Sequence, residues 1–323
     1  MRKNVPYVSN LALLILLFGC IGCRAREPSR QSYLSTGELL DLYESIYSKI
    51  LNAHVSYDYV LEKAEGDSSK LDRYTRYEKV DRIEEGEKYN IRYSIAHDGF
   101  TEPNNILQYA FDGSTTMEYY PKTRTGHIIG GQTGRSVETM NNLWHYMLIN
   151  RSNPRNPKLR EKYPAGRPYI RGAISQKALV RTQLEEVNGH WCHVADTLFR
   201  SEPYNTVWFA VDKGGLPIKF EMYKDGKCIR RILVTKVASL DTDLGKIYYT
   251  EQATDEFYDK DGYRLYKFRV NSFRPNIETT PEAFKLSFPN GTKVVDHVKG
   301  IWYTVGPLAE KEGGYGVLQG FNR

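Results

Sequence analysis

The stretch from Val180 to Val237 limits the fold more than any other part of the chain. It consists of short runs of alternating apolar and polar residues, such as TVWFAVD, IKFEMY and CIRRILVTKV, separated by turn residues. Asn188-Gly189 and Asp225-Gly226 are strong signals for two-residue hairpin turns, and Lys213-Gly214-Gly215 marks a third reversal. The stretch therefore predicts an antiparallel meander of strands.

The alternation within these runs predicts which face of the meander is buried. Ile218, Phe220 and Met222 share one face of their strand, because successive side chains of a strand point to opposite sides. Val207, Phe209 and Val211 repeat this pattern one run earlier. We expect a sheet with one face on an apolar core.

An amphipathic helix is expected before the first strand. Ser35 and Glu38 have the spacing of a capping box, and Leu34 with Leu39 can form the accompanying hydrophobic staple. The apolar stripe expected at helical spacing consists of Leu39, Leu40, Tyr43, Ile46, Tyr47, Ile50 and Leu51. This stripe needs a partner, which we expect to be the sheet.

Further elements are predicted along the rest of the chain. Expected strands cover 55–61, 71–80, 89–95, 106–111, 115–120, 246–252 and 265–270, with a last pair flanking Asn290-Gly291. A second helix, capped by Ser136, is expected to bury Met140, Leu143, Trp144, Met147 and Leu148. No repeat at a fixed period and no clear linker is present, so residues 35–305 are interpreted as one domain. The glycine-rich residues 306–323 are expected to form a flexible tail.

The first 22 residues are typical of a secretory signal peptide. Arg2 and Lys3 are followed by the apolar run 11–18, and small residues then precede a cysteine, as at a bacterial lipoprotein cleavage site. Two cuts fit, which would leave either Cys23 or Cys20 at the new N-terminus, and Cys23 is favoured as the lipid-attachment residue. An ordinary secreted protein with an unmodified cysteine is the alternative.

This leader predicts a bacterial cell-envelope location. Neither cut is followed by Asp, which by analogy with the sorting rule of enteric bacteria indicates the outer membrane, facing the periplasm. Residues 23–34 would then be a tether between the lipid and the domain. In this oxidising compartment, Cys192 and Cys228 could form a disulfide, but a simple meander places their strands apart, and buried free thiols are the default expectation.

The charge balance excludes some partner classes. The formal net charge is +6, and the leader holds two of the 45 basic residues and none of the 39 acidic ones, so about +4 remains. This excess is too small and too dispersed to predict nucleic-acid binding. Only residues 151–177 concentrate positive charge, and they are either a basic loop for anionic lipid headgroups or a solvated loop, which is the favoured reading.

No motif demands a catalytic or cofactor site. The run from Gly130 to Ser136 lacks the spacing and the lysine of a nucleotide-binding P-loop. His190, Cys192 and His193 fall on both faces of a strand and have no second cluster that would complete a zinc site. The sequence from Asp259 to Gly262 is read as a turn rather than a calcium loop. We therefore expect no enzyme activity, no cofactor and no metal.

The order of elements resembles that of a known family. The most recognisable passages are the hairpin at Phe111-Asp112-Gly113, the segment from Val187 to Val194, the strand from Val207 to Asp212, and the run from Gly215 to Glu221. This succession is similar to the lipoprotein-sorting superfamily of LolA, LolB and the periplasmic sigma-factor regulator RseB. The resemblance implies an α+β fold in which a curved, half-open antiparallel β-barrel wraps around a few α-helices.

The resemblance also implies a function. Proteins of this type hold acyl chains or another hydrophobic ligand against the sheet, without a cofactor, and can take part in sorting lipids or lipoprotein cargo. The side chains expected to contact such a ligand are Phe111, Trp208 or Phe209, Phe220 and Met222. The alternative function is that of a non-enzymatic interaction or envelope-sensing lipoprotein of the sigma-factor-regulator type.

Overall fold

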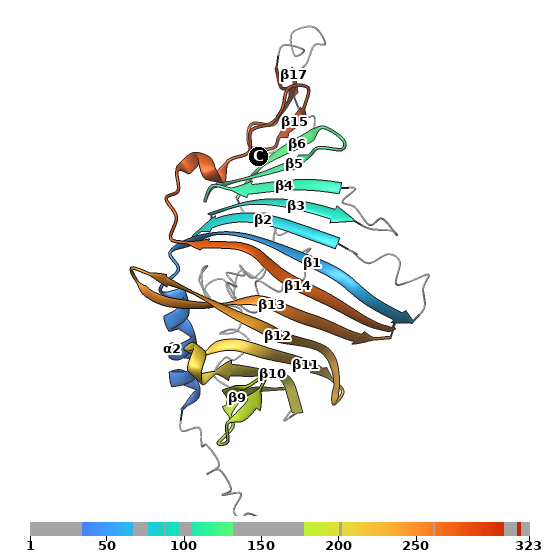
Figure 1. Ribbon diagram of the computed structural model, residues 1–323. Helices are drawn as coiled ribbons and strands as arrows, with labels where there is room; N and C mark the ends of the chain where they lie inside the picture. Colours follow the sequence, from blue (N-terminus) through green and yellow to red (C-terminus); the bar gives the residue numbers. More distant parts are fainter. Residues whose placement is uncertain are drawn as a thin grey trace, which may run out of the picture.

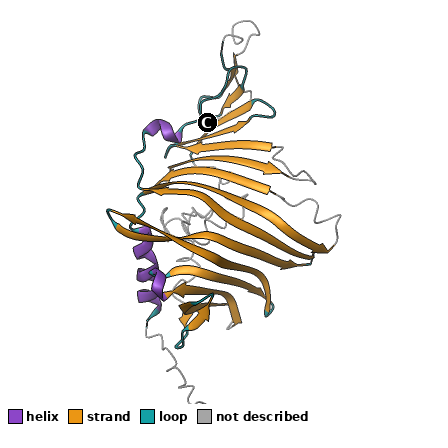
Figure 2. Ribbon diagram, in the orientation of Figure 1, coloured by secondary structure: helices purple, strands orange, loops and turns teal. Residues whose placement is uncertain are grey.

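One open sheet dominates the molecule. The computed structural model describes residues 34–66, 77–86, 88–96, 105–131, 178–199, 202–260, 262–306 and 315–317. These residues form a single curved sheet of 17 strands, against which helix α2 (Thr36–Tyr47) packs (Figures 1 and 2). The expected curved antiparallel sheet is confirmed. The sheet is not closed, however, and α2 is the one α-helix among the described residues, so the expected wrapping around several helices is not seen there.

The strands fall into two meanders and a C-terminal group. The first meander comprises β1 (Asn52–Gly66), β2 (Tyr77–Glu85), β3 (Lys88–Ala96), β4 (Asn105–Phe111), β5 (Thr115–Tyr120) and β6 (Thr125–Gly130). The second comprises β7 (Ala178–Val180), β8 (Glu185–Val187), β9 (His190–Phe199), β10 (Glu202–Ala210), β11 (Leu216–Lys224), β12 (Lys227–Thr242), β13 (Gly245–Asp259) and β14 (Gly262–Pro275). The C-terminal group is β15 (Lys293–Asp296), β16 (Ile301–Thr304) and β17 (Tyr315–Val317).

Two long-range pairings join these groups into one sheet. The last strand of the second meander, β14, pairs antiparallel with β1, in a register that runs from Ala53 opposite Pro275 to Gly66 opposite Gly262. At the far end of the first meander, β15 pairs with β6 in parallel. The remaining pairings of the described strands are antiparallel. At one end of the sheet, β7 and β8 both pair with β9, and at the other end β17 pairs with β16.

Several expectations about the C-terminal part are corrected. The strand expected directly before Asn290-Gly291 is not present, and β15 and β16 both follow the turn. The segment 276–292, which we call the strap, lies there and contains only the short 3-10 helix η2 (Pro281–Phe284). Part of the expected flexible tail, β17, pairs with β16. The leader, the expected helix around residues 136–148 and the basic residues 151–177 lie outside the described residues.

Helix α2 begins as predicted. Ser35 accepts a hydrogen bond from the backbone of Glu38, whose carboxylate accepts one from the Ser35 backbone, which completes the capping box. Of the apolar stripe, Leu39, Tyr43, Ile46 and Ile50 are buried, and the ring of Tyr43 meets that of Phe209 edge to face at 5.8 Å. Leu51, expected to continue the stripe, lies beyond the end of the helix and is exposed.

One face of the sheet carries the core. We call it the inner face and define it by Val55, Tyr57 and Tyr59 of β1 together with the residues directly opposite them on neighbouring strands. In the second meander it includes Phe209, which meets α2. Buried apolar residues of this face on the central strands include Val55, Tyr57, Tyr59, Val80, Tyr89, Ile91, Tyr93, Tyr109, Phe111, Phe220, Ile232, Tyr266, Phe268, Val270 and Phe273.

The inner face also buries charged side chains of β2. Glu78, Arg82 and Glu84 alternate with exposed residues and lie opposite Tyr59, Val55 and Ala53 of β1. Arg82 Nε donates to Glu84 Oε2 at 2.6 Å, so these two charges compensate each other. No hydrogen bond or ion pair of Glu78 occurs among the described residues, and burial raises the pKa of its carboxyl to about 7.

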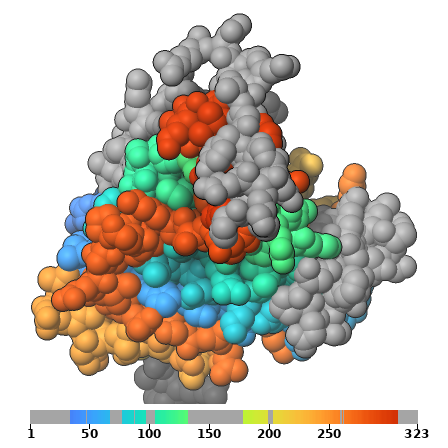
Figure 3. Space-filling view, turned by 90° about the horizontal axis from the view of Figure 1, so that it is seen from above, coloured from blue at the N-terminus to red at the C-terminus, as the bar shows by residue number. Residues whose placement is uncertain are grey.

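The strap crosses the opposite, outer face of the first meander. Asn90 of β3 donates to the carbonyl of Ala283, and the ring of Phe288 meets that of Tyr119 of β5 edge to face at 6.1 Å. Figure 3 shows the orange-red residues of this segment lying against the cyan and green strands. The strap thereby carries the chain from β14, near the middle of the sheet, to β15 beside β6.

The strap should be sensitive to one glycine of β6. A Cβ atom on Gly126 would lie 2.6 Å from Cε1 of Phe288, inside van der Waals contact. We expect Gly126→Ala to lower the free energy of unfolding by about 1–3 kcal/mol through overpacking, as measured by urea denaturation. Gly130→Ala is the matched control on the same strand, because its Cβ would have its nearest neighbour at 3.7 Å. Equal stability of the two variants would show that the ring does not rest on Gly126.

The raised pKa of Glu78 should make stability fall as the pH rises. Folded Glu78 keeps its proton to about pH 7, whereas in the unfolded chain the carboxyl releases it near the ordinary value of 4.5. Between these values the unfolded chain binds fewer protons, so the free energy of unfolding decreases with pH, by about 3 kcal/mol in total. Urea denaturation from pH 4 to 8 should show this slope in the wild type and lose it in Glu78→Gln. Asp81→Asn, which alters an exposed carboxyl of the same strand, should keep it.

Candidate functional site

A series of aromatic rings crosses the inner face of the first meander. Tyr93 of β3 meets Tyr109 of β4 edge to face at 6.0 Å, and Tyr109 meets Tyr120 of β5 at 6.3 Å. Tyr120 meets His127 of β6 at 6.1 Å, and His127 stacks on His297, in the turn after β15, at 5.7 Å. We call these five residues the aromatic ladder. Each ring comes from a neighbouring strand, so the ladder runs across the sheet from the core towards its edge.

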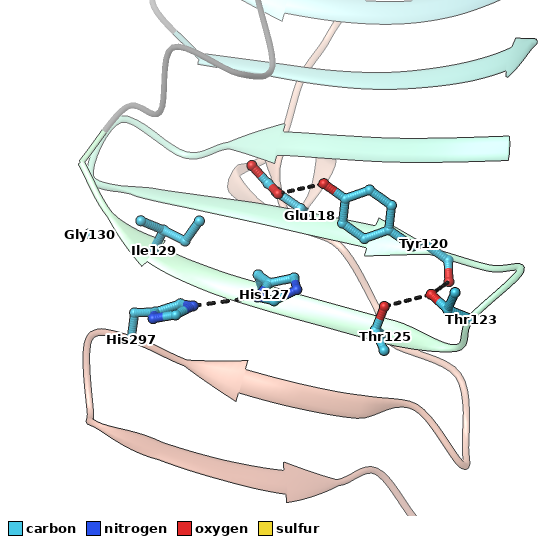
Figure 4. Close-up of a pocket in the computed structure, with 8 residues that line it drawn as sticks. All are labelled: Glu118, Tyr120, Thr123, Thr125, His127, Ile129, Gly130 and His297. Carbon is cyan, nitrogen blue, oxygen red and sulfur yellow. Dashed lines mark hydrogen bonds between the residues drawn. The ribbon is translucent and has the colours of Figure 1, made fainter. Parts of the chain in front are cut away.

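The outer end of the ladder borders an open cavity. Its volume is about 810 Å³, within the range of small-molecule sites. The lining residues come from β5, β6 and the turns beside them, and they are Glu118, Tyr120, Thr123, Thr125, His127, Ile129, Gly130 and His297. Figure 4 shows these residues on β5, on β6 and in the turn between them, with His297 approaching from the turn after β15. We call this space the β5–β6 cavity.

Polar side chains of the β5–β6 cavity form hydrogen bonds with one another. The Tyr120 hydroxyl donates to Glu118 Oε2 at 2.8 Å, and the hydroxyls of Thr123 and Thr125 are 2.7 Å apart. Nδ1 of His127 lies 3.4 Å from Nε2 of His297, so one imidazole can donate to the other (Figure 4). Hydroxyls, imidazoles and a carboxylate therefore meet around one space and offer both donors and acceptors to a ligand.

The electrostatics of the cavity centre on Glu118. This carboxylate is 3% exposed, and its cross-strand neighbours are Tyr109 and His127. Burial and the hydrogen bond to Glu118 raise the pKa of Tyr120 far above its usual value, so the phenol remains a donor at physiological pH. Within the described ranges, no three His, Cys, Asp or Glu side chains are arranged to hold a metal ion.

None of the titratable residues of the β5–β6 cavity was expected from the sequence. His127 and His297 are separated by 170 positions and meet only because β15 pairs with β6. Glu118 and Tyr120 do carry a local signal. A glutamate two positions before a tyrosine in a strand places both on one face, and the same contact recurs on the outer face as Glu221 with Tyr223 and as Glu256 with Tyr258.

A second opening lies at the ends of four strands of the second meander. The last paired residues of β12 and β13 at this end are Arg230 and Phe257, and beyond them the hairpin tips of β11–β12 and β13–β14 enclose a notch of about 1110 Å³. Its lining comprises Met222, Lys224, Asp225, Lys227, Cys228, Ile229, Arg230, Phe257, Tyr258, Lys260, Gly262 and Tyr263. We call it the hairpin notch.

The floor of the hairpin notch is held by a buried ion pair. Arg230 donates from Nε and Nη2 to the two carboxylate oxygens of Asp255, at 2.9 and 2.6 Å. The Tyr59 hydroxyl donates to the same carboxylate at 2.9 Å, and the Arg230 guanidinium lies over the ring of Phe257. Because Asp255 compensates Arg230, the lysines at the rim supply the positive charge that a ligand in the notch would meet.

The five residues predicted to contact a hydrophobic ligand have different surroundings. Phe111, Phe209 and Phe220 lie on the inner face and are buried in the core. Trp208 lies on the outer face, where its Nε1 donates to Glu185 at 2.8 Å and Lys219 covers its ring. Its direction is opposite to that of Phe209 because neighbouring residues in a strand point to opposite faces. Met222 borders the hairpin notch.

The two cysteines within the described residues do not pair. Cys192 on β9 and Cys228 on β12 are free thiols. Strands β10 and β11 lie between their strands, which implies a separation of about 14 Å at the usual strand spacing, beyond the reach of a disulfide. Cys192 is buried, whereas Cys228 is only partly buried.

The expected lipid-attachment residues, Cys23 and Cys20, lie outside the described residues. Among the residues that the structure does describe, no α-helix combines the length and the apolar character that a membrane-spanning segment needs. His190 contacts the carboxylate of Asp212, and His193 is buried.

Comparison with known proteins gives structural matches only. No protein-family model matches the chain, and no curated protein matches its sequence. A DUF1329 family protein from Desulfovibrio piger shares 9% identity, with 77% of this chain and 97% of the other covered, at a TM-score of 0.46. A LolA superfamily protein from Nitrosomonas europaea shares 11% identity, with 78% and 98% covered, at a TM-score of 0.41. The superfamily that the order of elements resembles is thus among the matches, at levels too low to assign an activity.

Proposed function

We propose that this protein is a lipid-anchored envelope protein that binds acyl chains or another hydrophobic ligand, without bond-making chemistry. The observation that carries the proposal is the aromatic ladder, which continues the buried inner face into the open β5–β6 cavity. An aromatic surface that passes from the core to an opening can accept a flexible chain at its exposed end, beside Tyr120 and Ile129.

The depth of the ladder limits where such a chain can lie. Tyr93 and Tyr109 are buried by neighbouring side chains, whereas Tyr120, His127 and Ile129 are only partly buried. The ligand is therefore assigned to the part of the inner face beside Tyr120, His127 and Ile129, and not to the part of the same face that α2 covers. This differs from the expectation based on Phe209 and Phe220, which are packed in the core.

The proposed location in the cell envelope is inferred from the leader, residues 1–22. The charged start, the apolar run 11–18 and the cysteine after small residues support export and lipidation at Cys23, with Cys20 as the alternative. A lipid at that position would hold the sheet at the outer membrane, facing the periplasm.

The lipid anchor can be tested by mass. Mature protein extracted from membranes should begin at Cys23 and carry the mass of an acylated diacylglycerol thioether. Cys23→Ser should abolish this modification and release the protein from the membrane fraction, whereas Cys20→Ser should not. Modification that persists in Cys23→Ser and disappears in Cys20→Ser would move the attachment to the alternative residue.

Ligand binding can be tested by native mass spectrometry of protein purified from the envelope. We expect lipid to accompany the wild type and the bound fraction to fall about tenfold in Ile129→Glu, which places a charge on the apolar part of the cavity wall. Leu179→Glu is the control, because it makes the same change at an exposed position on β7, at the other end of the sheet. Wild-type protein free of lipid would contradict the proposal.

A second candidate function, protein interaction, is supported by the hairpin notch. Met222 and Phe257 give it an apolar floor, and Lys224, Lys227 and Lys260 line it with positive charge, which suits an acidic segment of a partner protein. Capture from detergent extracts separates the two candidates, because a carrier of lipid alone brings no stoichiometric protein.

A further inference from the structure

The C-terminal strands extend the inner face beyond the β5–β6 cavity. Strand β15 pairs with β6, and β16 pairs with β15, so the sheet continues past the aromatic ladder (Figure 1). In these registers Val295 lies directly opposite His127, and Trp302 lies directly opposite Val295. Residues directly opposite each other in a sheet project from the same face. His127, Val295 and Trp302 therefore form one row on the inner face, which we call the C-terminal row.

The C-terminal row becomes more accessible to solvent towards its end. His127 lines the cavity, Val295 is half-buried, and Trp302 is 37% exposed. An indole is among the largest apolar surfaces that a side chain offers, so covering its exposed part removes a sizeable area from water. Ile129, on the same face of β6 as His127, adds an apolar side chain where the row meets the cavity. The row thus provides apolar contacts from the cavity to Trp302.

A polar row borders the C-terminal row on one side. Thr125 of β6 lies opposite Lys293 of β15, which in turn lies opposite Thr304 of β16. An apolar row with this border suits a single flexible chain rather than a protein partner, because protein interfaces use about 20–30 residues on each side. The three strand intervals from β5 to β16 cover about 14 Å, roughly the length of an extended twelve-carbon chain.

We infer that β15 and β16 complete the ligand site: the bound chain passes from the β5–β6 cavity along the C-terminal row, and its apolar end lies against the indole of Trp302. This inference rests on the proposed function and names the ligand class as a single-chain amphiphile. The hydroxyls and imidazoles of the cavity can hydrogen-bond the polar end of such a molecule, while the row receives its chain.

Fluorescence quenching tests the contact with Trp302, because a bromine atom on a chain quenches an indole that it touches. ω-Bromododecanol, and dodecanol as the probe without bromine, are titrated into the full mature protein freed of lipid. We expect the emission of the wild type to fall with the brominated probe only. This loss should disappear in Trp302→Phe. Trp191→Phe is the matched control, because it changes a tryptophan of β9, at the other end of the sheet, and it should keep the loss.

Chain length tests whether the row contributes to affinity. Each methylene group that leaves water strengthens binding by about fourfold, so dodecanol should bind the wild type at least about thirtyfold more tightly than octanol, as measured by calorimetry. In Trp302→Ala this ratio should fall to about fivefold, because the last methylene groups lose their apolar contact. Leu244→Ala, which truncates an exposed apolar residue of the β12–β13 turn, should leave the ratio unchanged. Thermal unfolding of each variant checks that the fold is retained.

The outcomes separate this inference from the proposed function. Quenching that persists in Trp302→Phe, or binding without any bromine-dependent quenching, would overturn the assignment of the chain to the C-terminal row. A ratio of dodecanol to octanol affinity that is the same in Trp302→Ala as in the wild type would also overturn it. In each of these cases chain binding in the cavity would stand. Failure of both alcohols to bind would contradict the proposed function as well.

Discussion

The pairing of β1 with β14 is the interaction on which the rest of the structure depends. Each meander can form from neighbouring hairpins, but only this long antiparallel junction joins their inner faces into one surface. It brings together strands about 200 positions apart, so its closure entropy must be offset by the contacts it makes. Those contacts are aromatic on the inner side, where Tyr59 stacks on Tyr266 at 4.6 Å and Tyr57 meets Phe268 at 5.1 Å.

The route of the chain after β14 follows from that junction. Because β14 ends in the middle of the sheet, the chain can reach the free edge of β6 only by crossing the first meander, and the strap does so on the outer face. The strap thus covers the outer face of the first meander, while the inner face of β5 and β6 remains open as a cavity. The strands of the sheet bend mainly outside the cavity. Register shifts, which bend a strand, occur in β1 and in the second meander, whereas the pairings from β2 to β6 are regular.

The local signals in the sequence were sufficient for much of this architecture. Asn188-Gly189 and Asp225-Gly226 do form turns with positive φ, and Ser35 with Glu38 does start the helix. These features depend on residues within a few positions of one another. The expected ligand contacts are a different case: Phe209 lies on the apolar face as expected, but whether a core residue faces a ligand or another side chain depends on packing that alternation does not encode.

Long-range features had no sequence signal. Nothing near His127 or His297 indicates that the two imidazoles meet, because their contact depends on the parallel pairing of β6 with β15. Strand β2 is a related case, since charged residues alternate on both of its faces and hydrophobic pattern alone could not set its register. Strand β2 can bury Arg82 and Glu84 on the inner face because the two side chains form an ion pair with each other, and Val80 adds an apolar side chain to the same face.

The candidate site uses the strand spacing of the sheet directly. Neighbouring strands lie about 4.8 Å apart, so rings that lean towards each other from successive strands meet at centroid distances near 6 Å, the range in which edge-to-face contacts are favourable. The ladder from Tyr93 to His127 has this spacing at every step. Its last ring, His297, is added by β15, which pairs in parallel with β6. The same strand β6 thus supports both ends of this arrangement: its outer face accommodates Phe288 of the strap at Gly126, and its inner face carries His127, on which His297 stacks.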